Sequence, residues 1–507
     1  MTILVRESAV SAKSVHLDVT PQSDERPAQQ GHTATDTERI PGIVDHLRRG
    51  FDSGVLSSLD SRRVQLEALR RMLAEQEDRI LDALVVDLGK PRPEAFTSEF
   101  YLTIKDIDDA LKRLTSWAKP RRVGIPILLQ PGSGRIHRQP LGTVCIIGPW
   151  NYPVRLVLGP LVPALAAGNT VVVKPSEVAP TVAGVLADLI PQYLDPSAVA
   201  VVTGGARETT VLLEQRFDHI MYTGNGAIGR VVMTAAARHL TPVTLELGGQ
   251  SPVIVAVDAN IAVAARRIAY GKFINAGQTC VAPNHVLVEE SVEQELLDAL
   301  TATITEFYGE DPSTSPDYGR IVNERHHDRV MGLLADGGYE RTVTGGTGDR
   351  ATRYIAPTVL AGVQPDAAVM GQEIFGPVLP VIAVRSIDEA IRSVNAQDKP
   401  LALYAFSSNR RTLQRIVERT SSGGMTLNHV VQHIGAPNLP LGGVGPSGMG
   451  AYNGETGFAT FSHSRSVLTK PTRPDPTVLF PPYTDIKQKI VRRFTPIPRG
   501  IRPRPPE

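Results

Sequence analysis

The order of apolar and polar residues near the start of the chain is typical of amphipathic helices. Between residues 61 and 90, apolar side chains recur three or four positions apart, and charged side chains fill most of the positions between them. A second stretch, DIDDALKRLTSWA, repeats the pattern over residues 106–118. The spacing therefore predicts a layer of at least two helices. The apolar positions of the first stretch are Val64, Leu66, Leu69, Leu73, Ile80, Leu84 and Leu88.

After Pro140 the pattern changes to short β-branched runs that alternate with helical segments. The runs are GTVCIIG, NTVVVK, AVAVVTG, HIMYTG and PVTLELGG. Strands joined by helices form parallel sheets, because a parallel pair needs a long return connection. We therefore expect a Rossmann-like α/β domain here. A second alternating block, from SPVIVAV to LALYAFSS, predicts a second α/β domain.

The same patterns suggest domain boundaries. Residues 1–36 are polar with little periodicity and predict a flexible tail. Residues 37–121 and 140–246 would form the helical layer with the nucleotide-binding domain, and residues 247–425 the second domain. Residues 122–139 and 426–470 are expected to form bridging or oligomerisation segments. Residues 471–507 are dense in Pro and Arg and predict a largely irregular extension.

Composition excludes several classes of protein. The chain has 507 residues, with 53 basic and 52 acidic side chains, so no global field favours nucleic acid or a membrane. Pro and Gly interrupt its most apolar stretch, so no transmembrane helix is expected. Two cysteines cannot build a disulfide framework, and MTILVRESAV lacks the apolar core of a signal peptide. We therefore expect a cytoplasmic protein, and no metal site is predicted.

One of these cysteines, Cys280, lies in the polar loop FINAGQTCVAP, where a core cysteine would be unusual. From the loop alone it is either a small buried hydrophobe or an accessible nucleophile. Cys145, within the apolar run TVCII, is expected to be core. A thiol that attacks a carbonyl needs an oxyanion donor and a base. Asn151 in GPWNYP can donate, although Asn often only forms turns, and Glu246 is an acid inside an apolar strand.

Other residues are candidates for binding a dinucleotide. The turn from Gly224 to Gly229 has the spacing of a dinucleotide fingerprint, but it follows the fourth strand instead of the first. It marks either a variant cofactor site or only the start of a helix. Lys174, Ser176 and Glu177 follow the second strand, at the sheet edge where ligands of such folds bind. Glu373 precedes the aromatic Phe375 in EIFGPVLP, and its simpler interpretation is an exposed loop acid.

Together these stretches resemble the aldehyde dehydrogenase superfamily. GPWNYP, VVVKPSE, LELGGQSP, the GQTC loop, EIFGPVLP and LPLGGVGPSGMG occur in the family's order, and the similarity runs from about residue 45 to residue 470. Stretches such as TPVTLELGG and TFSHSRSVL look like the class 3 branch, which includes the dimeric and fatty aldehyde dehydrogenases. The resemblance implies an aldehyde dehydrogenase fold with a small β arm. It also implies that the protein oxidises medium- or long-chain aliphatic or aromatic aldehydes to acids with NAD or NADP.

The resemblance also implies residue roles. Cys280 would be the nucleophile, Asn151 the oxyanion donor and Glu246 the general base. It further implies a homodimer without nucleic-acid partners, and the basic segment KQKIVRRF predicts at most weak contact with an anionic membrane. The implied cofactor-binding residues are Trp150, Lys174, Ser176, Glu177, Gly224, Asn225, Gly229, Leu247, Glu373 and Phe375.

Two departures and two alternatives accompany this interpretation. The family usually has Lys where this chain has Gln250, and commonly Ser where it has Asn225. Gln250 removes a charge close in sequence to Glu246, so the pKa of that acid is expected to differ from that in relatives. One alternative is a CoA-acylating dehydrogenase, which typically lacks the base. The other is a cofactor-binding protein of the same fold without turnover.

Overall fold

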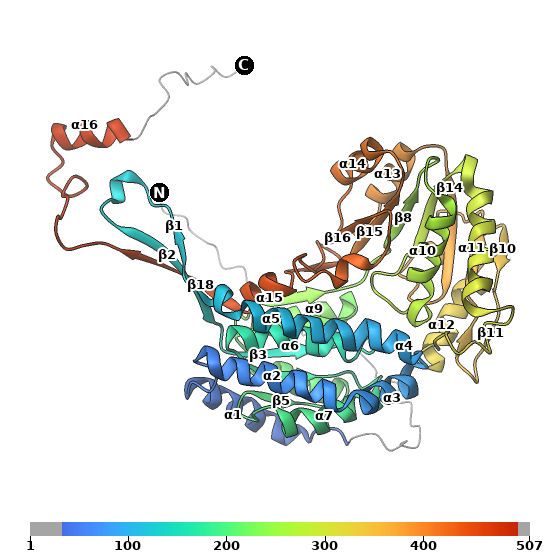
Figure 1. Ribbon diagram of the computed structural model, residues 1–507, viewed down its shortest axis with the longest axis horizontal. Coiled ribbons are helices and arrows are strands. Elements are labelled where there is room, and N and C mark those ends of the chain that lie inside the picture. The colour runs from blue at the N-terminus through green and yellow to red at the C-terminus, as the bar shows by residue number, and fades with distance from the viewer. Residues whose placement is uncertain (1–32, 495–507) are drawn as a thin grey trace, which may run out of the picture. The chain divides into compact units, whose positions relative to one another are not determined.

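The computed structural model describes residues 33–494 (Figure 1). The predicted tail over residues 1–36 therefore lies mostly outside the described residues, as do residues 495–507. The last part of that tail is fixed to the fold, because the Thr35 N–H donates to the carbonyl oxygen of Thr203 at 3.1 Å. A one-turn helix follows at Thr37–Arg39. The boundary expected at residue 36 is thus a few residues too late.

The predicted helical layer is present. Helix α2 begins where the Ser58 hydroxyl accepts from the Ser61 N–H, and α3 ends at Gly89, whose φ of 57° is left-handed. The apolar positions named above are buried except Val64, which is 57% exposed. After α4 the chain makes a π-helical turn, Phe96–Tyr101. The helices are α1 (Ile40–Asp52), α2 (Leu59–Glu75), α3 (Glu77–Leu88), α4 (Arg92–Ala95) and α5 (Leu102–Ala118).

All five strands predicted after Pro140 form one sheet. Its order is β17-β7-β6-β3-β4-β5, and all neighbours are parallel except the short β17, which is antiparallel to β7. The chain order reverses between β3 and β6, which is where open α/β sheets bind ligands at the carboxyl ends of their strands. The strands are β3 (Thr143–Ile147), β4 (Thr170–Lys174), β5 (Val199–Val201), β6 (His219–Thr223), β7 (Val243–Glu246) and β17 (Gly448–Met449).

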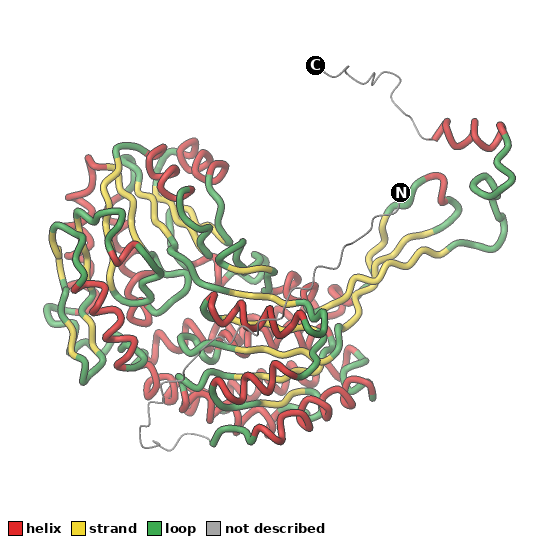
Figure 2. Tube along the Cα trace, turned by 180° about the vertical axis from the view of Figure 1, so that it is seen from behind, coloured by secondary structure: helices red, strands yellow, loops and turns green. Residues whose placement is uncertain are grey.

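This sheet is mostly buried because helices cover both of its faces (Figure 2). Val144 and Ile146 of β3 pack into the cluster that contains α2, α5, α6 and α7. Cys145, between them, faces α1, α8 and α9, where it is fully buried. The crossover helices are α6 (Arg155–Ala167), α7 (Pro180–Tyr193), α8 (Ala206–Glu214) and α9 (Gly226–Ala237).

The second sheet carries the thiol loop between two of its strands. Its order is β10-β13-β14-β9-β8-β15-β16, with β10 antiparallel to β13 and the other pairs parallel. The strands are β8 (Pro252–Val255), β9 (His285–Glu289), β10 (Arg341–Thr344), β13 (Thr358–Ala361), β14 (Val378–Val384), β15 (Ala402–Phe406) and β16 (Gly424–Leu427). The helices are α10 (Ile261–Phe273), α11 (Glu293–Tyr308), α12 (Glu324–Ala335), α13 (Ile387–Asn395) and α14 (Arg410–Arg419). A two-stranded ribbon joins β11 (Gly348–Asp349) and β12 (Tyr354–Ile355).

Three strands form a separate arm. Strand β2 (Ser133–Pro140) pairs with β1 (Arg121–Val123) on one side and with β18 (Ser462–Thr469) on the other, both antiparallel. Helix α15 (Gly454–Thr460) precedes β18. The boundary expected at residue 425 is wrong, because it cuts through β16, which belongs to the second sheet.

The C-terminal extension is more regular than its Pro content suggested. Residues 485–494 form α16 (Asp485–Phe494), none of whose side chains is buried. The surrounding prolines end the helix pattern on each side but do not enter it. Within residues 33–494, no helix has both the length and the apolar character needed to cross a bilayer.

Candidate active site

The loop that presents Cys280 is held in a left-handed conformation. Asn275, Ala276 and Gly277 have φ values of 51°, 50° and 76° directly after α10. A Cβ atom on Gly277 would lie 2.2 Å from the carbonyl oxygen of Gly376, so only glycine fits there. The Cys280 side chain is partly exposed, whereas Gln278 and Thr279 before it are buried. The close approach of the two backbones therefore fixes the loop, and Cys280 is a partly exposed residue within it.

The turn after β3 packs directly on this loop. The Asn151 side-chain amide donates to the carbonyl oxygen of Gln278 at 3.0 Å. The hydroxyl groups of Tyr152 and Thr279 lie 2.7 Å apart. Asn151 uses one amide hydrogen in this bond, and among residues 33–494 no acceptor is found for the other. One amide hydrogen of Asn151 thus has no hydrogen-bond acceptor among the described residues.

Glu246 is the last residue of β7 and is 2% exposed. Burial raises its pKa to about 7, while the Tyr452 hydroxyl, the Arg155 charge and the Thr223 hydroxyl act in the opposite direction. The Thr223 hydroxyl donates to it at 3.5 Å, and the Tyr452 hydroxyl lies nearby without a hydrogen bond of full geometry. A carboxyl group with a pKa near neutrality suits general acid–base chemistry.

Cys280 differs from an ordinary thiol. Burial raises its pKa well above the usual range, and the nearby charges of Glu246 and Glu373 raise it further, although the Cys280 and Val281 backbone N–H groups act against them. Both acids therefore lie within electrostatic reach of the sulfur. The Cys280 thiol is therefore harder to ionise than that of a free cysteine.

Three of the residues predicted to bind the cofactor lie together at the end of β4. The Lys174 ammonium donates to the Glu177 carboxylate at 2.9 Å. Lys174 is almost fully buried, whereas the Glu177 side chain is 51% exposed. The Ser176 hydroxyl accepts from the Val178 N–H at 3.3 Å and so shapes the turn. Glu177 thus offers an accessible carboxylate that is oriented by a buried cation.

Packing explains two glycines of the fingerprint turn. A Cβ on Gly224 would lie 2.2 Å from the Tyr222 hydroxyl, and one on Gly229 would lie 3.0 Å from Leu247. Asn225 caps α9 by accepting from the Ile228 N–H at 3.0 Å, as a Ser would. The turn is therefore the start of a helix that follows β6, and a helix start is a place where backbone N–H groups can bind an anion.

Glu373 is another of the residues predicted to bind the cofactor. A Cβ on Gly248 would lie 1.9 Å from a carboxylate oxygen of Glu373, so Glu373 lies against the backbone that follows Glu246. Burial raises the pKa of Glu373 to about 7. Its Oε1 atom is buried without a hydrogen-bond partner among residues 33–494. A ribose hydroxyl would satisfy this oxygen, so the residues present fit a dinucleotide.

Aromatic rings complete this part of the site. The Trp150 and Phe375 rings meet edge to face at 5.3 Å, and His326 lies 5.0 Å from Trp150 on another side. Phe375 adopts a φ of 47°, which is unusual for an aromatic residue.

The family model described as "Aldehyde dehydrogenase family" matches residues 10–467. This chain belongs to the aldehyde dehydrogenase family.

Individual relatives agree with the class 3 resemblance. The rat "Aldehyde dehydrogenase, dimeric NADP-preferring" is 50% identical over 431 residues, which cover 85% of this chain and 94% of the rat protein. The mouse "Aldehyde dehydrogenase family 3 member A2" is 48% identical over 453 residues, covering 89% and 93%. The solved "Substrate bound state of Staphylococcus Aureus AldH" has a TM-score of 0.87 and 44% identity, covering 90% and 99%. The chain is thus an NAD(P)-dependent aldehyde dehydrogenase that oxidises aldehydes to acids.

The side chain of Gln250 has a structural role in the fold. Its amide donates to the carbonyl oxygen of Met370 at 2.9 Å and so holds the loop that leads to Glu373. Gln250 is not among the groups that shift the pKa of Glu246. The difference from relatives that was expected in the pKa of Glu246 stays a prediction.

Sequence reasoning missed several residues around the reacting groups of the dehydrogenase. Tyr152, Tyr452 and Arg155 each lie beside a predicted catalytic residue, and a buried pair, Lys90 and Glu99, lies behind Asn151. Tyr152 adjoins Asn151 in the sequence and could have been noticed. The other residues belong to no recognisable motif, and their helical or loop segments become neighbours only in the fold.

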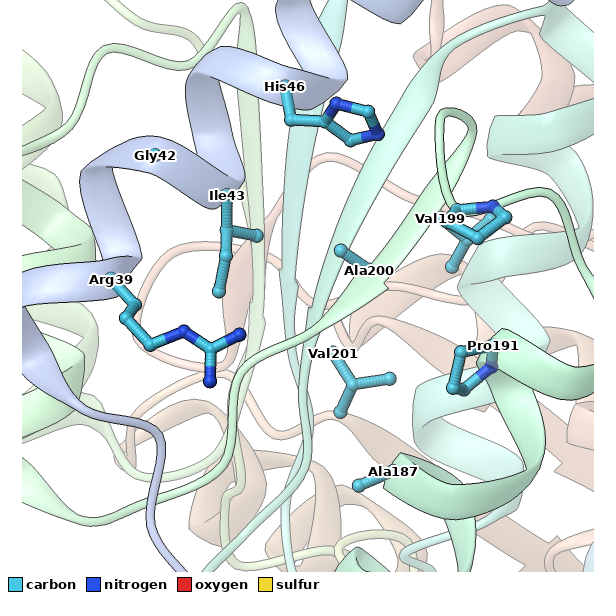
Figure 3. A pocket seen from close by; sticks show the side chains of 10 residues that line it. Arg39, Gly42, Ile43, His46, Ala187, Pro191, Val199, Ala200 and Val201 are labelled. Carbon is cyan, nitrogen blue, oxygen red and sulfur yellow. The ribbon is translucent and has the colours of Figure 1, made fainter.

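A surface groove of about 520 Å³ lies elsewhere in the dehydrogenase, between α1, α7 and β5 (Figure 3). Ile43, Pro191 and Val199 contribute apolar lining, and Arg39 and His46 lie at its rim. None of the predicted site residues lines it. The groove is therefore separate from the site described above.

Proposed function

We propose that Cys280, Asn151 and Glu246 carry out the oxidation. We further propose that the cofactor-binding residues named in the sequence analysis, among them Trp150 and Phe375, hold the cofactor. The observation that carries the proposal is a buried carboxyl group, Glu246, with a pKa of about 7 within electrostatic reach of the one partly exposed thiol in residues 33–494. A cofactor-binding protein without turnover would have no need for this pairing.

The first half of the reaction builds a bond to sulfur. The Cys280 thiolate attacks the aldehyde carbon, a C–S bond forms, and the carbonyl π pair moves to oxygen. The resulting alkoxide accepts from the free Asn151 amide hydrogen and from the Cys280 backbone N–H. When bound, the cofactor supplies an acceptor for the hydride that leaves this carbon. As the hydride leaves, the alkoxide electron pair re-forms the C=O bond and a thioester remains on Cys280. The orphan oxygen of Glu373 and the Lys174–Glu177 pair orient the cofactor through its riboses.

The second half releases the acid. Glu246 takes a proton from water, the hydroxide attacks the thioester carbon, and the C–S bond breaks to return the thiol. Because the pKa of Glu246 is about 7, the group is partly deprotonated at neutral pH and can also return the proton. Because the pKa of Cys280 is raised, the Glu246 carboxylate has a second candidate role, which is to remove the thiol proton.

Rapid mixing of a Glu246→Gln variant with aldehyde and NAD distinguishes these duties. If Glu246 activates water, the first turnover should proceed and give a burst of reduced nucleotide, an acyl-enzyme visible by intact mass, and partial rescue by hydroxylamine. If its main task is to deprotonate Cys280, neither burst nor rescue should occur. Cys280→Ser should abolish both phases while cofactor binding survives. Wild-type turnover that requires CoA instead of water would favour the acylating alternative.

The substrate class is also a proposal. We infer medium- or long-chain aliphatic or aromatic aldehydes, supported by the class 3 relatives and by the aromatic residues near the thiol, including Tyr152 and Tyr404. Initial rates with hexanal, decanal, hexadecanal and benzaldehyde, each with NAD and with NADP, test it. Preference for a short polar aldehyde would contradict the inference.

We further propose a homodimer formed through the arm. Strands β1 and β18 are mostly exposed, and Ile127 and Leu468 of the arm are 58% and 49% exposed. Three strands without a covering layer are at the limit of independent stability, which favours a second copy as cover. Strand β16 forms one edge of the second sheet and offers unpaired backbone groups. The rat relative is named dimeric.

Two weaker proposals concern location. A cytoplasmic site is supported by two cysteines that stay unpaired, and cell fractionation tests it. Peripheral contact with anionic lipid is supported by α16, where Ile486, Ile490 and Phe494 are exposed beside basic residues. Flotation with anionic vesicles at low salt, with and without residues 471–507, tests the contact. Equal flotation of both chains would end this idea.

A further inference from the structure

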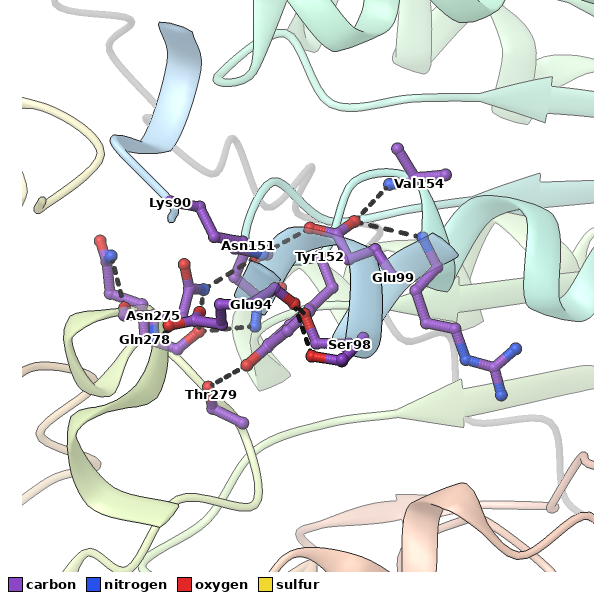
Figure 4. Close-up of polar contacts among 12 residues, drawn as sticks. Lys90, Glu94, Ser98, Glu99, Asn151, Tyr152, Val154, Asn275, Gln278 and Thr279 are labelled. Atoms are coloured by element: carbon purple, nitrogen blue, oxygen red, sulfur yellow. Dashed lines mark hydrogen bonds and ion pairs between the residues drawn. The ribbon is translucent and has the colours of Figure 1, made fainter. Parts of the chain in front are cut away.

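Two opposite charges that the mechanism does not use are completely buried behind the oxyanion donor (Figure 4). Lys90 follows α3, and Glu99 lies in the π-helical turn of residues 96–101. Both side chains are 0% exposed and form an ion pair with each other. Neither residue is among the groups assigned to the reaction. Their other contacts indicate what they do.

Lys90 holds both residues of the turn that carries the donor. Its Nζ atom donates to the carbonyl oxygen of Asn151 at 3.1 Å. The same ammonium lies 4.0 Å from the centre of the Tyr152 ring. The Asn151 carbonyl also accepts from the Asn275 side-chain amide at 2.8 Å. Two donors thus fix the orientation of this peptide group, and the side chain of Asn151 is attached to it.

Glu99 holds the residues that come next. Its Oε2 atom accepts from the N–H groups of Val154 at 2.9 Å and Arg155 at 3.3 Å. Val154 is the N-cap residue of α6, and Arg155 is its first helical residue. The Val154 side chain does not cap the helix. A carboxylate from another element therefore caps α6 and lies at the positive end of its dipole.

Within the described residues, the side-chain hydrogen bonds and the cation–π contact of this pair, apart from those to each other, end within residues 151–155. The Glu94 carboxyl group also lies within electrostatic reach of both charges. A buried ion pair is a weak source of stability, because desolvation offsets most of the attraction. Packing with apolar residues would fill the same space. The pair does supply fixed hydrogen bonds to the segment that presents Asn151.

We propose that Lys90 and Glu99 are positioning residues that hold the Asn151 amide where the alkoxide forms. The inference rests on the proposed role of Asn151. A misplacement of about 1 Å lowers a rate strongly when a group acts through a directed hydrogen bond. The pair therefore contributes to the rate of hydride transfer and not to binding of the cofactor.

The test is a double-mutant cycle on the full chain. The burst rate of NAD reduction is measured for wild type, Lys90→Met, Asn151→Ala and the double variant. Lys90→Met should slow the burst by about 10- to 100-fold, less than or equal to the effect of removing one oxyanion donor. In the Asn151→Ala background the same change should slow it less than about 3-fold, because the group that it positions is gone.

Two controls separate positioning from general damage. Alkylation of Cys280 by iodoacetamide forms no oxyanion, so its rate and the NAD dissociation constant should stay within about 2-fold of wild type. Lys105→Met, which removes an exposed lysine beside Tyr101, should leave every rate unchanged. Glu99→Gln keeps the side-chain shape and should give the same pattern as Lys90→Met.

Each outcome decides a different claim. An unchanged burst in Lys90→Met, or an equal fold-loss in both backgrounds, overturns the inference and leaves the role of Asn151 intact. A burst in Asn151→Ala equal to wild type overturns the proposed role of Asn151 itself. If neither Lys90→Met nor Glu99→Gln yields protein with native circular dichroism, the pair serves folding, and the inference is wrong.

Discussion

Folding buries the carboxyl group of Glu246 at the end of an apolar strand. The stability of the protein should therefore depend on pH. Burial raises the pKa of Glu246 from the usual 4.5 to about 7. The folded chain then holds a proton that the unfolded chain has released across this range, so the free energy of unfolding falls as pH rises through it. Glu373 shows the same shift for the same main reason. The site is built at the expense of stability near neutral pH.

Glu246→Gln should therefore stabilise the protein only above the acidic range. The pKa of Glu246 rises from 4.5 to about 7 on folding. At about 1.4 kcal/mol per pKa unit, this rise sets an upper limit of about 3 kcal/mol on the gain in the free energy of unfolding. We expect a gain of about 1–3 kcal/mol in the free energy of unfolding at pH 8 and almost none at pH 4. Urea denaturation at both pH values measures it. A gain that is equal at the two pH values would show that burial of the charge is not the cause.

At the level of elements, the thiol loop depends on one glycine. Gly277 approaches the carbonyl oxygen of Gly376, so the loop before Cys280 and the loop after Glu373 and Phe375 are fixed against each other. A side chain at this position would separate the nucleophile from the residues that hold the cofactor. The two loops therefore act as one unit.

Gly277→Ala should damage both stability and turnover. Its Cβ would meet an oxygen at 2.2 Å in a left-handed backbone, and we expect a loss of about 2–4 kcal/mol in the free energy of unfolding. The matched control is Gly332→Ala in α12, where no atom lies within 4 Å of the added carbon and φ is not left-handed. This change should be neutral or stabilise by up to about 1 kcal/mol. Thermal unfolding and steady-state rates of both variants provide the measurement.

The elements also show where prediction from sequence succeeds. Strands β3 to β7 could be predicted because a strand covered on both faces is a continuous β-branched run. Cys280, Asn151 and Glu246 were selected from ordered family motifs, and their roles stay a prediction. The Lys90–Glu99 pair could not be expected, because Lys90 reaches a backbone atom 61 positions away, and no short pattern encodes such a contact. Helix α16 was missed because its amphipathic ten residues are surrounded by proline.

At the scale of the whole molecule, the arm is the part least supported by its own chain. Strand β18 pairs with β2 along its full length, yet most side chains of β18 remain exposed. Backbone pairing alone does not exclude water from such a surface. A second copy that covers the arm would provide the missing apolar contact.

Leu468→Glu should therefore weaken the dimer. Leu468 is 49% exposed in β18, and a charge there would have to be desolvated when a partner covers the arm. We expect the dissociation constant of the dimer to rise by at least about 10-fold in sedimentation equilibrium, with the far-ultraviolet circular dichroism unchanged. Leu479→Glu, in the C-terminal extension, is the control. A fully monomeric wild type would remove the basis of this expectation.

The different surroundings of the two sulfur atoms have a practical consequence. Cys145 is sealed inside the first sheet, whereas Cys280 is reachable from solvent. A chromogenic disulfide reagent added to native protein should therefore count one thiol per chain, and in denaturant it should count two. The difference turns a routine colorimetric assay into a measure of what fraction of a preparation has an intact nucleophile, independent of any aldehyde.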